Sequence, residues 1–241
     1  MIRALRNTTA AELTKLWSLP AVVATALGTI VASVILAAAL ATSAASASND
    51  VSLITVQAIV FLQIGPILLG VLAASTEYEG RQIVTTLTAT PNRSLLLAGK
   101  ASAYVGVVVT ASVTAVGAGA ATVWIVLDAH GTAPARPVDL GSLTGAAIYL
   151  VLIGLLALAV AVLMRSLIGP LVTMLALVLI VSPLLAGYTE HARALPDRAG
   201  RLLYLPDSDP ALTPGTGALI LLAWIAATAL AAVVAFTRRD A

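Results

Sequence analysis

The sequence predicts an all-α membrane protein with six transmembrane helices, and two observations carry that prediction. The chain of 241 residues is 60% hydrophobic and only 10% charged, whereas a soluble domain carries about 25% charged residues. Six windows of 24 to 34 residues contain no Asp, Glu, Lys or Arg. Because about 20 apolar residues cross the hydrocarbon core of a bilayer, each window is long enough for one span and too short for two.

Residues 1–19 are predicted to form an amphipathic helix on the inner membrane surface. Thr9 and Glu12 fit a capping box at its start. Lys15 falls on the polar side of the helix, and Trp17 on the apolar side suits the headgroup level. The segment is therefore expected to lie along the membrane before the first span begins.

We expect a single transmembrane domain, residues 1–241, with one span in each charge-free window. Gly65-Pro66 should kink the second span. A tight turn at Arg165-Ser166 makes the fourth and fifth spans antiparallel neighbours. The expected spans are residues 20–42, 51–75, 101–127, 142–164, 167–186 and 215–236.

Residues 187–214 form the longest segment expected outside the cytoplasm. A simple hairpin needs only a few residues, and this segment contains two Leu-Pro steps and both signs of charge. We expect short helices here that fold back onto the bilayer.

The basic residues favour a cytoplasmic location for both termini. An even number of spans puts the termini on one side, and nine of the 13 Lys and Arg residues then lie inside, as the positive-inside rule requires. We expect a multi-pass protein of the cell inner (cytoplasmic) membrane. A cleaved signal peptide is the alternative for the first span, and Ala45-Ser46-Ala47 resembles a cleavage site. The apolar run is longer than a typical signal segment, which disfavours that alternative.

No residue pattern indicates catalysis or metal binding in this chain. Cysteine is absent, His130 and His191 fall outside the expected spans, and those spans contain no ionisable residue. Intramembrane enzymes and ion-coupled transporters keep such residues within the membrane. If the chain transports a molecule, the free energy must come from a partner protein, so we expect a transporter subunit that is not itself an enzyme.

Residues 76–100 form the largest predicted cytoplasmic feature. Acidic residues follow the second span, a short helix with apolar residues at helical spacing comes next, a proline ends it, and a basic segment enters the third span. The residues that mark this order are Glu77, Glu79, Gly80, Arg81, Ile83, Leu87, Pro91, Arg93 and Lys100. Such a helix can transmit a push from a partner protein to the second and third spans.

These features together resemble the transmembrane subunit of ABC-2-type transporters, which include drug and lantibiotic-immunity exporters. The resemblance lies in the order Glu77, Gly80, Pro91-x-Arg93 and Gly99-Lys100, together with Glu12, Lys15 and Trp17 of the first helix. It covers the whole chain, including the six spans and the long segment before the last one. Arg81-Gln82 replaces the Gly-Thr of the commonest version, which leaves the subfamily undecided.

The resemblance implies a dimer of permease subunits, identical or sister chains, above two ABC ATP-binding subunits. No cofactor is expected in this chain, because the partner ATPase would bind ATP and Mg. Residues 1–19 would be the elbow helix, and the 76–100 segment would hold the coupling helix that docks on the ATPase. The substrate pathway would be lined mainly by the second and fifth spans, at Gln57, Phe61, Gln63, Pro66, Thr173, Met174, Leu177 and Pro183.

Two other functions remain open at this stage. A six-span channel-like or structural membrane protein would explain the charge-free spans without ATP coupling, but not the pattern in residues 76–100. A membrane enzyme would need a nucleophile or metal ligands beside Glu77 and Glu79, and the sequence has none there. A pathway without charge suits a hydrophobic or amphipathic cargo such as a drug, a peptide or a lipid-like molecule.

Overall fold

The computed structural model describes residues 2–44, 50–79, 93–131, 136–209 and 211–238, and these residues contain helices and no strand. Six helical stretches are long and apolar enough to cross a membrane. The predicted all-α, six-span architecture is therefore confirmed, and the chain is a multi-pass membrane protein. The spans cover Pro20–Ser43, Val51–Ser75, Leu95–Ala129, Leu140–Met164, Ile168–Ala186 and Pro214–Ala235.

Several spans comprise more than one helix, and short helices occur between the last two. The described helices are α1 (Ile2–Ser18), α2 (Pro20–Ala44), α3 (Val51–Gln57), α4 (Ile59–Leu62), α5 (Ile64–Glu79), α7 (Arg93–Ala129), α8 (Leu140–Met164), α9 (Ile168–Ala176), the π-helix η1 (Leu177–Val181), α10 (Ser182–Ala186), the 3₁₀ helix η2 (Glu190–Ala194), α11 (Pro196–Arg201), the 3₁₀ helix η3 (Pro206–Ser208) and α12 (Pro214–Arg238).

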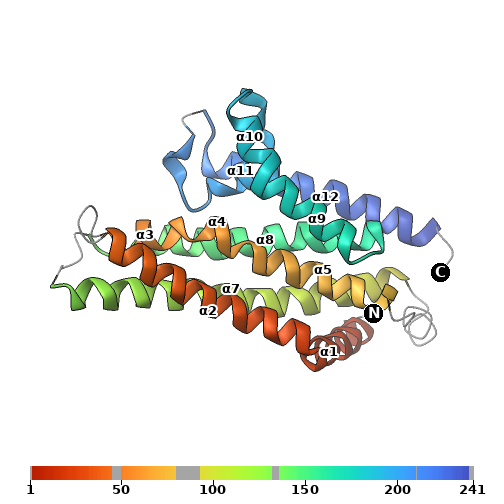
Figure 1. The fold of residues 1–241 in the computed structure, drawn as a ribbon. Coiled ribbons are helices and arrows are strands. Elements are labelled where there is room, and N and C mark those ends of the chain that lie inside the picture. Colours follow the sequence, from red (N-terminus) through yellow and green to blue (C-terminus); the bar gives the residue numbers. More distant parts are fainter. Residues whose placement is uncertain (1, 45–49, 80–92, 132–135, 210, 239–241) are drawn as a thin grey trace.

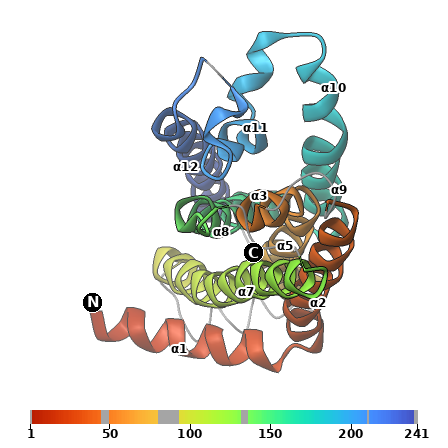
Figure 2. The same cartoon turned by 90° about the vertical axis from the view of Figure 1, so that its left-hand side faces the viewer.

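The first helix lies across the bundle, while the spans run along it. Figures 1 and 2 show α1 at right angles to the long axis that α2, α7 and α8 share. The end of α5, the start of α7 and the end of α12 lie at the same end of the bundle as α1 (Figure 1). We call this the α1 end. An amphipathic helix perpendicular to the spans has the geometry expected of one in the membrane surface.

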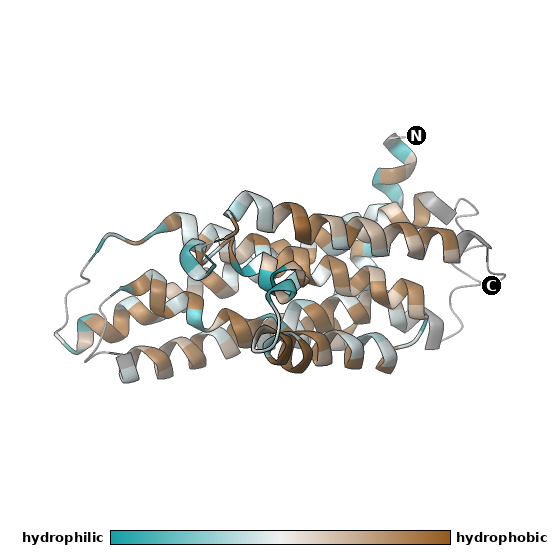
Figure 3. Cartoon of the chain, turned by 90° about the horizontal axis from the view of Figure 1, so that it is seen from above, coloured by the Kyte–Doolittle hydropathy of each residue, from teal (hydrophilic) through white to brown (hydrophobic). Residues whose placement is uncertain are grey.

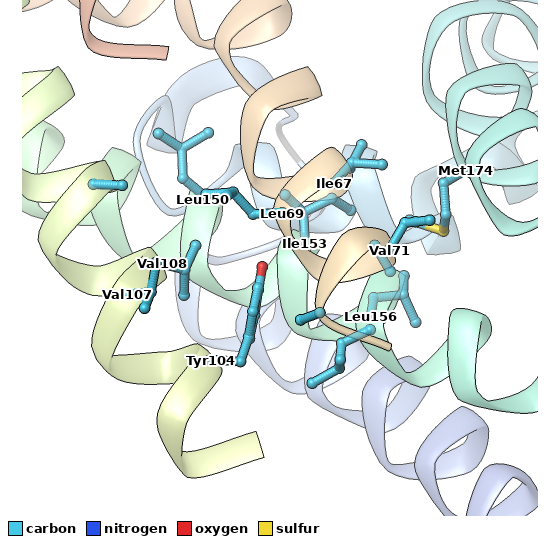
Figure 4. Packing of buried hydrophobic residues seen from close by; sticks show 14 of the residues in the cluster. Ile67, Leu69, Val71, Tyr104, Val107, Val108, Leu150, Ile153, Leu156 and Met174 are labelled. Carbon is cyan, nitrogen blue, oxygen red and sulfur yellow. The ribbon is translucent and has the colours of Figure 1, made fainter. Parts of the chain in front are cut away.

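The core is built where α5, α7 and α8 meet. Figure 4 shows Tyr104 of α7 among aliphatic side chains that include Leu69, Ile153 and Leu156, all of them buried. The Tyr104 hydroxyl donates to the Pro66 carbonyl at 2.9 Å. Because lipid offers no hydrogen-bond partners, polar groups at this depth must be satisfied within the protein, and this hydroxyl is.

The second and fifth spans depart from regular helix. The second span is interrupted at Ala58 and again at Gln63, shortly before the Gly65-Pro66 pair that predicted a kink. The fifth span changes from α9 to the π-helix η1 and back to α10, which the sequence did not indicate. Short π segments within α-helices occur frequently at functional sites.

The segment of residues 187–209 contains short helices, as predicted, and packs against α8 and α12. Figure 3 shows its hydrophilic residues above spans that are otherwise apolar. A side chain added at Gly145 of α8 would place its Cβ 1.8 Å from the Leu203 carbonyl oxygen, so only glycine allows this approach. The Trp224 indole N–H of α12 donates to the Ala194 carbonyl at 2.8 Å. The segment is thus attached to two spans.

Candidate functional site

A buried ion pair joins three helices at the α1 end. The Lys100 Nζ of α7 donates to the Glu12 Oε2 of α1 at 2.8 Å and to the Ala73 carbonyl of α5 at 3.1 Å. The lysine and glutamate side chains are only 6% and 7% exposed. One ammonium therefore ties the surface helix to the second and third spans.

Lys100 lies within a helix that starts ahead of the predicted span. Helix α7 begins at Arg93, whereas the third span was predicted from residue 101, so Lys100 lies on α7 at the end where α1 crosses it. The burial is possible because Glu12 supplies the opposite charge. A buried ion without such a partner is strongly destabilising.

Gly99 allows α1 to pack directly on α7. A Cβ atom at Gly99 would lie 2.5 Å from the Thr8 Cγ2 atom of α1, which is closer than real carbon atoms approach. Gly99 and Lys100 are adjacent in the sequence and contribute to this contact in different ways. Gly99 allows the close approach of α1, and Lys100 forms the ion pair that links α1 to the spans.

The capping box predicted at Thr9 and Glu12 is wrong. Helix α1 begins at Ile2 and continues through both residues, and the Glu12 carboxylate binds Lys100 instead of a backbone N–H. The other predicted residues of this helix lie toward its end. Trp17 is 55% exposed and Lys15 is half-buried, so the indole is available to the headgroup layer.

Most of the predicted ATPase-coupling residues lie outside the described part of the chain. Glu77 and Glu79 fall in the last turns of α5, and Arg93 is the first residue of α7. Their backbones are therefore at the α1 end. The residues that lie outside the described ranges are Gly80, Arg81, Ile83, Leu87 and Pro91.

The predicted pathway residues divide between the surface of the chain and its interior. On the second span Gln57 of α3 and Phe61 of α4 are exposed, with Phe61 56% exposed. On the fifth span Thr173 and Pro183 are exposed and Leu177 is half-buried. Gln63, Pro66 and Met174 are buried within the chain.

Gln63 belongs to a buried polar network that reaches the 187–214 segment. Its amide donates to the Val60 carbonyl at 2.7 Å, and its Oε1 accepts a short hydrogen bond from the Tyr149 hydroxyl. The Tyr149 ring packs against the Tyr204 ring, with centroids 5.3 Å apart. The interruption at Gln63 is thereby connected through α8 to the folded-back segment.

Asp197 of α11 is a charged residue close to this network. Burial raises the pKa of its carboxyl, and the nearby Ser182 hydroxyl offsets part of the rise. The Asp197 Oδ1 and Ser182 Oγ atoms are nevertheless buried without a hydrogen bond of normal geometry. Sequence reasoning missed Tyr149, Tyr204 and Asp197. The sequence offered one indication: two tyrosines and an aspartate stand out in a chain with few aromatic and charged residues.

Comparison with known proteins adds no further assignment. No protein-family model matches the chain, and no curated protein gives a significant sequence match.

Proposed function

We propose that the chain is the transmembrane permease subunit of an ATP-driven exporter of the ABC-2 type. It would act as a dimer, either with a second copy or with a sister permease, and two separate ATP-binding subunits would bind at the α1 end. That end would be cytoplasmic, with both termini there, in the cell inner membrane. ATP and Mg would bind to the partner ATPase, so this chain would carry no catalytic residue.

The observation that carries the proposal is the junction of Glu12, Lys100 and the Ala73 carbonyl. It ties α1 to α5 and α7, and those two helices flank the 80–92 segment, in which a coupling helix is predicted. Helix α7 is continuous over 37 residues, or about 55 Å. A displacement applied at the α1 end would therefore move α1 and the second and third spans together.

The exposed faces of the spans support a pathway shared between subunits. In three spans, few residues of the apolar stretch are buried inside the chain. The buried share is 22% in the first span, 22% in the fifth and 11% in the sixth. Gln57 is exposed, and so are the apolar residues Leu53, Val60 and Phe61 near it in the sequence. A neutral amide in a membrane favours a polar partner or a wet cavity. An apolar face with a single amide suits a hydrophobic or amphipathic cargo, such as a drug, a peptide or a lipid-like molecule.

The test is co-purification of the tagged chain from its native membrane in mild detergent, with identification and stoichiometry of the bound proteins. The proposal predicts a P-loop ATPase at about one copy per permease chain. A second permease band would indicate a heterodimer. The absence of an ATPase, under conditions that preserve other membrane complexes, would contradict the proposal and favour a channel-like protein without ATP coupling.

A further inference from the structure

A cavity of about 490 Å³ opens beside α11, between the end of the fifth span and the rest of the 187–214 segment. Its size is in the usual range for small-molecule sites, about 300–1,000 Å³. Its lining is partly apolar, through residues such as Ala186, Leu202 and Leu212. The charged residues that line it are Glu190, Arg193, Arg198, Arg201 and Asp209.

The acids of this cavity neutralise only one of its three arginines. Arg193 Nε lies 3.0 Å from Asp209 Oδ2, and Arg193 Nη1 lies 3.6 Å from Glu190 Oε2. Within the described residues, neither Arg198 nor Arg201 forms an ion pair with an acid. Arg198 and Arg201 thus line the cavity without a direct ion pair in the described part of the chain, and the acid that acts on Arg198 is Asp197 of the same helix, which is not among the cavity residues.

The Arg201 guanidinium is not fully satisfied within the protein. Its Nε atom is buried and makes no hydrogen bond within the described structure. Buried polar groups are almost always hydrogen-bonded, so an exception requires an explanation such as an unseen ion. The buried Nε atom is not itself open to the cavity, so an anion would bind the Nη groups of Arg201, with the Asp197 carboxylate four residues earlier on the same helix.

The protein holds α11 firmly enough to pre-form such a site. A Cβ atom at Gly200 would lie 2.5 Å from the Tyr149 ring, and one at Gly217 of α12 would lie 2.3 Å from the Ala199 carbonyl oxygen. Helices α8 and α12 therefore pack directly against α11 on two sides. The arginine side chains start from a fixed backbone, which lowers the cost of ordering them around a ligand.

We propose that this cavity binds a phosphate group, with Arg198 and Arg201 as its ligands. The planar guanidinium presents N–H donors in a fork that matches two phosphate oxygens. The shared chemistry fits either the headgroup of an anionic phospholipid or a free phosphate ion. The site is at a distance from the α1 end, so it would exist whether or not an ATPase binds there.

Native mass spectrometry of the full chain in dodecyl maltoside tests the site. It counts bound molecules directly, including any phospholipid retained from purification. One arm titrates dihexanoylphosphatidylglycerol, and the other titrates inorganic phosphate. Saturable binding of the lipid alone would support the site with a lipid source, and binding of both would show that the phosphate group suffices. Saturable binding of neither would overturn the proposal.

Variants assign the binding to the two arginines. Arg201→Gln and Arg198→Gln should each weaken binding about tenfold to a hundredfold, because each removes charge-assisted hydrogen bonds. Arg136→Gln removes one exposed arginine outside the cavity and should leave binding unchanged. If Arg201→Gln fails to fold, Arg198→Gln and Arg201→Lys provide the same test. Equal weakening by Arg136→Gln would overturn the assignment, because it would show that binding follows net charge alone.

Discussion

Replacing Lys100 with methionine should destabilise the chain by about 3–5 kcal/mol, because the Glu12 carboxylate would remain buried without its opposite charge. The two side chains are 6% and 7% exposed, so water cannot replace the ammonium group. The variant also loses the hydrogen bond from Nζ to the Ala73 carbonyl at 3.1 Å. All three helices at the α1 end would thus lose a shared contact.

The assay is equilibrium unfolding in mixed micelles for the wild type, Lys100→Met, Glu12→Gln and the double variant. The double-mutant cycle isolates the energy of the pair. The double variant should lose less stability than the two single variants added together, by about 0.5–3 kcal/mol, because neither charge is then left alone.

An exposed cation on the same helix provides the matched control. Arg6 of α1 is exposed, and Arg6→Gln should change the free energy of unfolding by less than about 0.5 kcal/mol. If Lys100→Met costs no more than Arg6→Gln, the pair is not buried in the folded protein and the reasoning fails.

Three further predictions concern other buried groups, each measured by the same unfolding assay. Tyr149→Phe leaves the Gln63 Oε1 atom without its donor and should cost about 1–3 kcal/mol. Gly99→Ala should destabilise the contact with α1, because the new methyl group would overlap the Thr8 side chain. Burial raises the pKa of the Asp197 carboxyl in the folded chain. Its stabilising contribution is therefore present below the unfolded pKa and is lost as the pH rises through the folded pKa. Asp197→Asn should gain stability relative to the wild type as the pH is raised from about 4 to 7.

Each of these predictions has a control and an outcome that would refute it. Tyr188 is 86% exposed, so Tyr188→Phe should be neutral, and an equal loss in both tyrosine variants would refute the role of the Gln63 hydrogen bond. Combining Thr8→Ser with Gly99→Ala should restore part of the stability, because it removes the Cγ2 atom at 2.5 Å but leaves the Cβ atom at 3.0 Å; a double variant no more stable than Gly99→Ala would show that overlap with Cγ2 is not the cause. Asp207→Asn at an exposed position should show no such pH trend. A constant difference between Asp197→Asn and the wild type at all pH values would exclude titration of Asp197.

The sequence predicted the spans well because their signal is a property of composition. A run of about 20 apolar residues without charge is most stable in the hydrocarbon core of a bilayer, and the thickness of that core sets the length of the run. The same reasoning did not predict that Lys100 is buried. Lys100 lies inside α7, and the opposite charge beside it comes from the distant Glu12. A pairing over 88 residues of sequence is invisible to local patterns.

The polar contact between the second and fourth spans could not be predicted for a similar reason. Tyr149 and Gln63 are 86 residues apart in the sequence, and each lies in a span that is apolar on average. Short helices in the 187–214 segment could be expected from its length and prolines. The close approach of the Leu203 backbone depends on Gly145, a glycine that the sequence does not distinguish from a packing residue.

The central claim is that the 80–92 segment couples ATP hydrolysis in a partner to this membrane domain. The most direct measurement is the ATPase activity of the complex reconstituted in liposomes, with residues 80–90 intact or replaced by a flexible linker of equal length. The account predicts that the variant inserts normally and that stimulation of the ATPase by the membrane subunit is abolished. Full stimulation in the linker variant would contradict it.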